Sequence, residues 1–269
     1  MQITASARLP PAALACAPRL CVQWASTLDD IRRAQRLRYQ VFVEEMGAVI
    51  EPRQEGMAGI EEDRFDAFCD HLLVKAVDDA DGEETVVGTY RVLSPEAARR
   101  AGGYYSDTEF DLAPLARFRD TAVELGRSCV HSRWRRGGVV MMLWNALGRY
   151  MRERKLDTMI GCASVSLADG GAAAKATWAR INSSQCLHAA ELRVRPRKAY
   201  EISPAEAVGP EHGRFFDVPT MLKGYLRCGA RVLGPPAYDE AFNTADFPLM
   251  MRLVELQPMY RQHFMGDSE

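Results

Sequence analysis

The chain has 269 residues, and its 34 lysines and arginines nearly balance 36 aspartates and glutamates, giving a formal net charge of −2. This balance lacks the basic excess on which sequence-independent nucleic-acid binding depends, so we expect no nucleic-acid partner. Hydrophobic residues make up 47% and charged residues 26% of the chain, values typical of a globular protein that buries a core.

The seven cysteines are an odd number and include no C-x-x-C pair. A disulfide framework or a zinc site needs closer pairing, so we expect reduced thiols, a cytoplasmic protein and no metal site. Residues 1–18 are alanine-rich but are broken by Pro10, Pro11 and Pro18. We interpret them as a flexible tail, neither a signal peptide nor a membrane span, followed by a single domain over residues 19–269.

The expected elements begin with a strand over residues 20–25. Ser26 or Thr27 then caps a helix, because short polar side chains accept hydrogen bonds from the free amides of a first turn. Apolar residues at helical spacing continue the helix until Gly47 ends it. Residues 48–68 are rich in acidic side chains and predict an ordered loop.

The rest of the chain predicts alternating strands and helices. Residues 168–217 are interpreted as an insertion with one helix around residues 172–181, and Pro219 opens a last helix that runs through Cys228. The order indicates an α/β (α+β) fold, in which helices flank a mixed, mostly antiparallel central sheet. Strands are predicted over residues 71–77, 85–93, 122–130, 158–165, 231–233 and 247–254, with a helix from residue 139 to about residue 154.

The turn before the helix at residue 139 carries a signal for anion binding. Gly137 and Gly138 open this helix, whose free N–H groups and dipole favour a negative charge. Arg133, Arg135 and Arg136 stand just before the glycines. The pattern predicts a phosphate cradle, and a helix that simply starts with glycines beside surface arginines is the open alternative.

Residues 131–140 resemble the acyl-CoA motif of the GNAT superfamily, R/Q-x-x-G-x-G/A, through Arg135 and Gly138. In that motif the last small residue lets the backbone approach the pyrophosphate of coenzyme A, and Val140 replaces it here. The resemblance therefore implies acyl carrier protein as the donor, with its acyl-phosphopantetheine as co-substrate and no permanently bound cofactor. The residues expected to contact this donor are Val130, Arg133, Arg135, Arg136, Gly137 and Gly138.

A second likeness to the superfamily lies at Tyr225-Leu-Arg-Cys-Gly229. It resembles the Y-x-x-x-G-F signature, in which the tyrosine protonates the departing thiolate. An aromatic residue packed before a helix-ending glycine is the alternative.

Residues 38–127 resemble the acyl-homoserine-lactone synthases, GNAT relatives that take acyl groups from acyl carrier protein. One tryptophan expected from that family is replaced near Ala48. The matching positions are Arg38, Phe42, Asp63, Asp66, Arg91, Glu124 and Arg127.

The fullest resemblance is to the ornithine-lipid-synthesising N-acyltransferases, whose relatives are often labelled haemolysin-like. It spans residues 38 to about 247 and implies transfer of a 3-hydroxyacyl group from acyl carrier protein to the α-amine of L-ornithine, giving lyso-ornithine lipid. A peripheral contact with the inner membrane is a further expectation. The segments that carry the resemblance are 65–74, 88–91, 104–112, 124–131, 161–164 and 222–226.

Amide formation from a thioester needs a proton acceptor for the amine and hydrogen bonds for the oxyanion. Glu124 is an acid within an apolar strand, where acids are depleted, and we expect it to be the proton acceptor. A structural ion pair with Arg91 or Arg127 is the alternative. The family resemblance implies a β-bulge here, and main-chain N–H groups from Arg127 to Cys129, Ser128 included, that face the thioester oxygen.

The acceptor side is assigned to charged and aromatic residues around the acidic loop. Asp63 and Asp66 suit a cationic amino acid, with solvated loop acids as the alternative. His71 opens a strand, where a satisfied core histidine is favoured over a role at the site. The residues expected to bind the acceptor are Arg38, Phe42, Asp63, Asp66, His71, Arg91 and Arg127.

Other functions compete with this hypothesis. The acceptor could be another amino acid, and synthesis of an acyl-homoserine lactone from S-adenosylmethionine is disfavoured by the missing tryptophan and the long insertion. An acyl-enzyme on Cys129 would need a lowered thiol pKa, and direct transfer is favoured over it. A lipid-binding protein without catalysis, as the haemolysin label suggests, is disfavoured because no secretion signal or strongly amphipathic cationic helix is present.

Overall fold

The computed structural model describes residues 18–50, 58–78, 82–136, 138–184, 186–202, 218–257 and 260–261. Apart from Pro18, the predicted tail lies outside these residues, as does the last part of the predicted insertion. None of the helices in the described part of the chain combines the length and apolar character that a membrane crossing requires.

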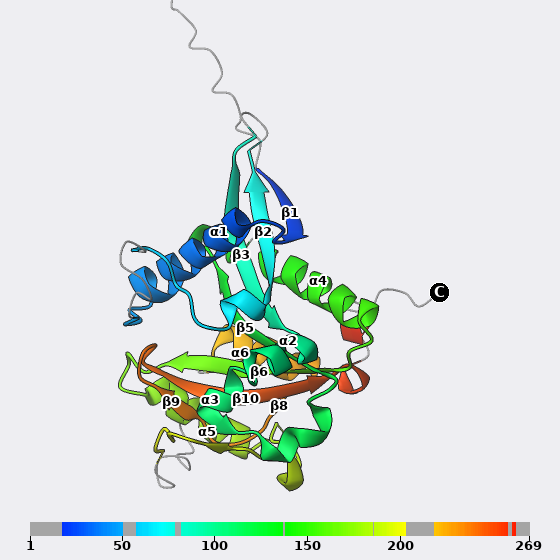
Figure 1. Cartoon of the computed structure of the whole chain (residues 1–269). Helices are drawn as coiled ribbons and strands as arrows, with labels where there is room; N and C mark the ends of the chain where they lie inside the picture. The colour runs from blue at the N-terminus through cyan, green and yellow to red at the C-terminus, as the bar shows by residue number, and fades with distance from the viewer. Residues whose placement is uncertain are drawn as a thin grey trace, which may run out of the picture.

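Eight strands within the described residues form the central sheet in the order β1-β2-β3-β5-β6-β10-β8, with β9 paired to β10, and β4 (Phe110–Asp111) and β7 (Arg195–Pro196) form a separate two-stranded sheet (Figure 1). Neighbouring strands are antiparallel except β5 and β6, which confirms the prediction of a mixed, mostly antiparallel sheet. The strands are β1 (Arg19–Trp24), β2 (Asp70–Val77), β3 (Glu84–Leu93), β5 (Ala122–Val130), β6 (Thr158–Ser166), β8 (Arg231–Val232), β9 (Ala237–Asp239) and β10 (Thr244–Arg252).

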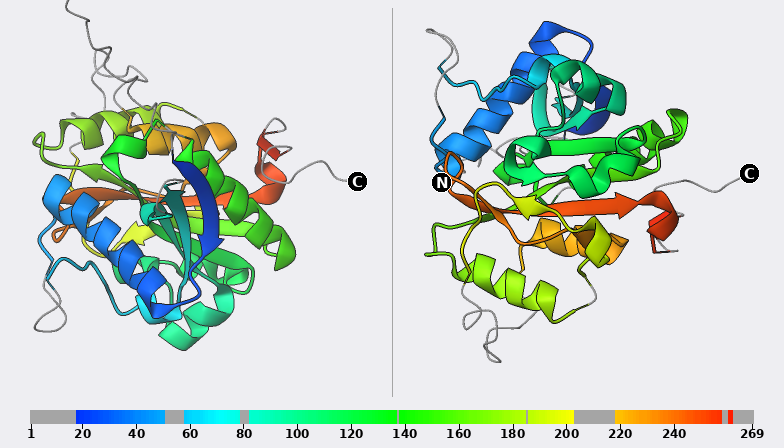
Figure 2. Two further views of the ribbon diagram at one scale, coloured as in Figure 1. Left: turned by 90° about the horizontal axis from the view of Figure 1, so that it is seen from above. Right: turned by 60° about the horizontal axis from the view of Figure 1, so that its bottom comes forward.

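The first half of the sheet is covered by a helix on each face, because successive side chains of a strand point to opposite sides. Leu73 of β2 packs against α1 (Leu28–Arg38), which continues as a π-helical segment, Tyr39–Glu45. Leu72, the residue before Leu73 in β2, packs against α4 (Val139–Glu153) on the other face of the sheet. Figure 2 shows the two helices on opposite sides of these strands.

The second half of the sheet is covered in the same way. Apolar residues of β6 and β10 pack on one face against α5 (Ala172–Asn182) and α6 (Thr220–Cys228). The other face carries α2 (Pro95–Ala101) and leads to α3 (Ser106–Glu109). The helix predicted inside the insertion is therefore confirmed as α5.

Most predicted elements are present within a few residues of their expected bounds, and Thr27 is the N-cap of α1, accepting a hydrogen bond from the Asp30 amide at 3.1 Å. The pattern missed α2 and the short strands β9, β4 and β7. A strand of two residues has no periodicity to detect. β4 and β7 exist because they pair across a long stretch of sequence.

The two halves of the sheet meet at β5 and β6 and then part. β5 and β6 pair only from Ala122–Thr158 to Glu124–Ile160. In the first half of the sheet, β2 and β3 run steeply across the direction of β6 and β10 (Figure 1). Next to the Glu124–Ile160 pair, a Cβ on Gly161 would lie 2.3 Å from the Leu125 carbonyl oxygen. Glycine therefore permits the closest approach of the strands where they separate.

Gly161→Ala should destabilise the protein by about 1–3 kcal/mol, because an added methyl group must displace the backbone of β5. The free energy of unfolding in urea measures this effect. Gly126→Ala is the matched control, since a Cβ there meets no atom within 4 Å. Equal stability of the two variants would show that the contact at Gly161 does not constrain the strands.

Candidate active site

The gap between β5 and β6 opens into a cavity of about 680 Å³. β5 forms one wall, β6 and β10 form another, and the first turn of α4 and the start of α6 contribute to its lining. Of the residues assigned from the sequence, the lining includes Phe42, Arg91, Glu124, Arg127, Ser128, Cys129, Val130, Arg135 and Tyr225.

The other residues assigned to the acceptor do not line the cavity but form a buried network behind it. Arg38 is fully buried and pairs with Glu61 at 2.5 Å and with Asp66 at 2.8 Å. Asp66 also pairs with Arg91 at 3.0 Å. Although burial alone would raise it, these two arginines hold the pKa of Asp66 well below its usual range. His71 lies 3.1 Å from the Asp66 carbonyl oxygen, which supports the core-histidine interpretation.

The β-bulge implied by the family resemblance is present in β5. Arg127 has a φ of 49°, and the register of β5 against β3 shifts between Thr89 and Arg91. The Arg127 guanidinium lies 4.7 Å from the centroids of both the Tyr105 and Phe242 rings. It pairs with Glu61 at 3.0 Å and Asp63 at 3.3 Å. The strained residue is thus held by charge and by aromatic contacts.

After the bulge, the edge of β5 that faces the gap has no partner strand among the described residues. The His131 amide donates to the Val87 carbonyl of β3 at 2.9 Å. Because N–H groups alternate along a strand, Cys129 also faces β3, whereas Ser128 and Val130 direct their amides to the gap. Of the expected donors between Arg127 and Cys129, the register therefore favours Ser128 and adds Val130. Burial raises the pKa of the Cys129 thiol to about 12, which argues against an acyl-enzyme.

The predicted anion cradle lies at the mouth of the cavity. α4 begins at Val139 behind Gly138, whose φ is 78°, and Val140 lies in the first turn and lines the cavity. Arg135 donates to the Val130 carbonyl at 3.2 Å and pairs with Glu45 at 2.5 Å. The other assigned arginines, Arg133 and Arg136, are exposed, and Gly137 lies outside the described residues.

Glu124 is buried in the cavity wall with donors around its carboxylate. One oxygen accepts from the Tyr105 amide at 2.6 Å, and the other accepts from the amide and hydroxyl of Ser106 at 2.8 and 2.6 Å. Burial raises its pKa, and these hydrogen bonds oppose the rise. Its hydrogen-bond partners are therefore the first residues of α3, whereas Arg91 and Arg127 pair with other acids. The role of Glu124 as proton acceptor stays a prediction.

Tyr225 projects from α6 into the cavity beside β3. Its hydroxyl lies 2.6 Å from that of Tyr90, and its ring stacks on Trp144 with centroids 5.4 Å apart. Burial raises the pKa of Tyr225 well above its usual value, and the phenol stays protonated at neutral pH. Tyr225 packs before the helix-ending Gly229 and also lines the cavity, and its role in protonating the thiolate stays a prediction.

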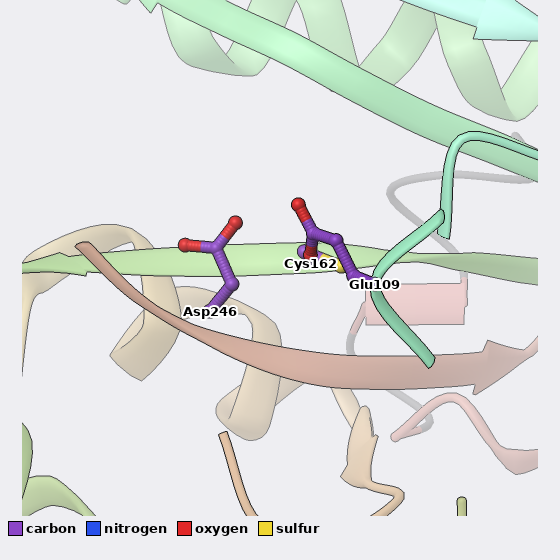
Figure 3. Close-up of side chains that lie close together, drawn as sticks. All are labelled: Glu109, Cys162 and Asp246. Atoms are coloured by element: carbon purple, nitrogen blue, oxygen red, sulfur yellow. The ribbon is translucent and has the colours of Figure 1, made fainter. Parts of the chain in front are cut away.

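The sequence did not predict a second group of acids at the β10 side of the cavity. Asp239 and Asp246 line the cavity, and Glu109 at the end of α3 faces Asp246 with Cys162 nearby (Figure 3). Asp246 is an acid inside an apolar strand, the same signal that identified Glu124. It was missed because it falls just before the predicted start of that strand.

Comparisons with known proteins agree with this arrangement. Residues 37–145 match the Acetyltransferase (GNAT) domain family. The chain is 34% identical to the L-ornithine N(alpha)-acyltransferase of Brucella abortus (strain 2308), over 92% of this chain and 89% of that protein. It is also 34% identical to the protein of the same name from Rhodobacter capsulatus, over 90% and 93% of the two chains.

Solved structures share the fold at low sequence identity. The N-acyl amino acid synthase FeeM from uncultured soil microbes superposes with a TM-score of 0.53 at 12% identity, covering 91% of this chain and 98% of its own. The acyl-homoserine-lactone synthase LasI superposes with a TM-score of 0.51 at 15% identity, covering 94% and 98%. These likenesses support the GNAT-like fold.

Glu124→Gln should lower the free energy of unfolding by about 1–3 kcal/mol, because the amide must turn a donor toward the donors of Tyr105 or Ser106. Urea unfolding measures the change, and the exposed Glu96 on α2 provides the control Glu96→Gln. Under conditions in which the variant stays folded, turnover reduced about 10²–10⁴-fold would support Glu124 as the proton acceptor, and normal turnover would exclude it.

Proposed function

Because the chain belongs to the family of L-ornithine N(alpha)-acyltransferases within the GNAT superfamily, we propose that it transfers a fatty acyl group from acyl carrier protein to the α-amine of L-ornithine, giving lyso-ornithine lipid. The chain is an acyltransferase on the strength of this family. The observation that carries the proposal is the cavity at the parted strands, which β5 lines on one side and the acids Asp239 of β9 and Asp246 of β10 line on the other.

The thioester would lie along the open edge of β5. When the amine attacks, the carbonyl oxygen gains negative charge, and the amides of Ser128 and Val130 are placed to donate to it. Fixed main-chain donors need no reorganisation during the reaction, so they stabilise this charge more than the ground-state carbonyl. The rigid bulge at Arg127 sets their direction.

The departing phosphopantetheine thiolate needs a proton. Tyr225 lines the cavity, and its hydroxyl oxygen lies 2.6 Å from that of Tyr90. In the arrangement we propose, Tyr90 donates to Tyr225, whose own proton is then available to the thiolate. A phenol with a raised pKa is protonated throughout the neutral range and is available to donate. We assign this role to Tyr225. The amine's proton passes to a carboxylate of the cavity wall, for which Glu124 is the predicted acceptor.

The donor assignment rests on the mouth of the cavity. Val140 places a β-branched side chain in the first turn of α4, where the small residue of the acyl-CoA motif would stand. Exposed Arg133 and Arg136 lie beside it and suit the acidic surface of a carrier protein. A single phosphodiester demands less room than the coenzyme A pyrophosphate, so this mouth favours the carrier protein.

The proposal is tested by incubating the purified protein with 3-hydroxyacyl carrier protein and a panel of amines, scored by mass spectrometry. The panel contains ornithine, the common amino acids and S-adenosylmethionine. Acyl-ornithine with release of the carrier-protein thiol is the expected result. Preference for another amine would replace the acceptor, and thiol release without an acylated amine would contradict amine transfer.

The kcat/KM with acyl carrier protein as donor should exceed the kcat/KM with the matching acyl-CoA. Val140→Gly should narrow this difference by raising kcat/KM with acyl-CoA. Met141→Gly is the control, because it adds a helix glycine of similar cost at a neighbouring exposed position. Steady-state kinetics with both donors provides the measurement. Equal use of the two donors by the wild type would overturn the donor assignment.

Tyr225→Phe should lower kcat about 10²-fold and leave KM for both substrates nearly unchanged, since it removes a proton donor but keeps the ring stacked on Trp144. Tyr238→Phe, on β9, is the matched control. A normal kcat in Tyr225→Phe would contradict this role and would mean that solvent protonates the thiolate.

A further inference from the structure

Two acidic side chains from distant parts of the sequence face each other beside the cavity. Glu109 extends from the end of α3 toward Asp246 on β10, and Cys162 of β6 lies next to them (Figure 3). One carboxylate oxygen of each acid and the Cys162 sulfur lie within 4.8 Å of one another. Asp246 is 4% exposed and also lines the cavity.

Glu109 lacks the partners that a buried carboxylate requires. Both of its carboxylate oxygens are buried, and neither makes a hydrogen bond of normal geometry within the described part of the chain. Asp246 accepts a hydrogen bond from the Thr244 hydroxyl at 2.7 Å, and the Ser164 hydroxyl is a further donor. Glu124 on β5, in contrast, has donors on both oxygens. The carboxyl groups of Glu109 and Asp246 therefore form an acidic pair with fewer hydrogen bonds than Glu124 has.

The surroundings of the pair increase the free-energy cost of its missing hydrogen bonds. Burial, followed by the Asp246 carboxylate, raises the pKa of Glu109 to about 8, and burial raises that of Asp246 to about 6. Asp239 adds a further negative charge, whereas the Tyr105 hydroxyl and the Cys162 thiol lie near Glu109 as donors that lower its pKa. Arg127 lowers the pKa of Asp246, but it is already paired with other acids. A bound cation with several N–H donors would offset the cost.

We propose that Glu109 and Asp246 form the subsite for the side-chain ammonium of a diamino-acid acceptor, an inference that rests on the proposed N-acyltransferase function. An ammonium group offers three donors and a positive charge, which are the features that the unpartnered oxygens lack.

The position of the pair in the sheet fits this subsite. Asp246 is paired with Ser164 of β6, four residues beyond Ile160, which is the partner of Glu124 on β5. Counting along β5 and β6 from the Glu124–Ile160 pairing places Asp246 across the gap from the stretch of β5 that begins at the bulge and includes Ser128. An acceptor whose second amine binds Asp246 thus holds its α-amine between the acids and the proposed thioester position.

The test compares ornithine with norvaline, which has the same carbon chain without the second amine. Glu109→Gln and Asp246→Asn should each lower kcat/KM for ornithine about 10- to 100-fold, the cost of losing a hydrogen bond between charged groups. Their kcat/KM for norvaline should stay within about twofold of the wild type. Glu96→Gln, on the exposed face of α2, is the control and should change neither value.

The ligand-free variants give an independent readout. Because folding raises the pKa of Glu109 above 4.5, this side chain destabilises the native state increasingly as pH rises from 4.5 to about 8. Glu109→Gln should therefore melt at a higher temperature than the wild type at pH 8, and the difference should shrink toward pH 4.5. Ornithine should raise the melting temperature of the wild type more than that of the variant.

Three outcomes would overturn the subsite. Equal losses with ornithine and norvaline would place the pair in the chemistry or the fold, while acylation of ornithine by the wild type would leave the proposed function intact. A wild type that acylates monoamino acids but not ornithine would remove the subsite and the proposed acceptor together. Tight binding of Mg²⁺ or Zn²⁺ by the wild type, lost in Glu109→Gln and required for activity, would make the pair a metal site.

Discussion

The separation of β5 from β6 is the constraint on which the rest of the site depends. The two strands pair over a few residues and then diverge, so in the described part of the chain no strand pairs with this edge of β5 beyond Glu124. Unpaired amides inside a protein are costly unless a partner reaches them. Here they face a cavity large enough for a substrate, and the partner we assign to them is the thioester oxygen.

The parted geometry is maintained by interactions on both sides of the gap. Gly161 allows the strands to touch where they separate, and the bulge at Arg127 turns the rest of β5 away from β6. Arg127 is held in its strained conformation by Glu61 and Asp63, and Arg38 joins the same network beneath it. Because breaking a buried ion pair leaves an uncompensated charge, this network serves to hold one backbone arrangement.

Charge is distributed unequally between the two ends of the cavity. The mouth carries exposed arginines beside the first turn of α4, which suits a phosphate and an acidic protein surface. The β10 side carries the half-buried Asp239 and the buried Asp246, which suit an ammonium group. A thioester donor and a cationic acceptor would therefore enter regions of opposite charge and meet at the edge of β5.

The sequence by itself determined most strands and helices, because periodicity and caps are local, and it placed Glu124, Arg127 and Tyr225 at one site through the family resemblance. Tertiary structure alone decided which groups each side chain meets. Whether Glu124 contacts an arginine or the start of α3 depends on how chain segments about twenty residues apart pack. The pairing of Glu109 with Asp246 joins residues separated by more than half the sequence, and no local pattern encodes it. Backbone conformation follows from neighbours along the chain, whereas hydrogen-bond partners and pKa shifts follow from neighbours in space.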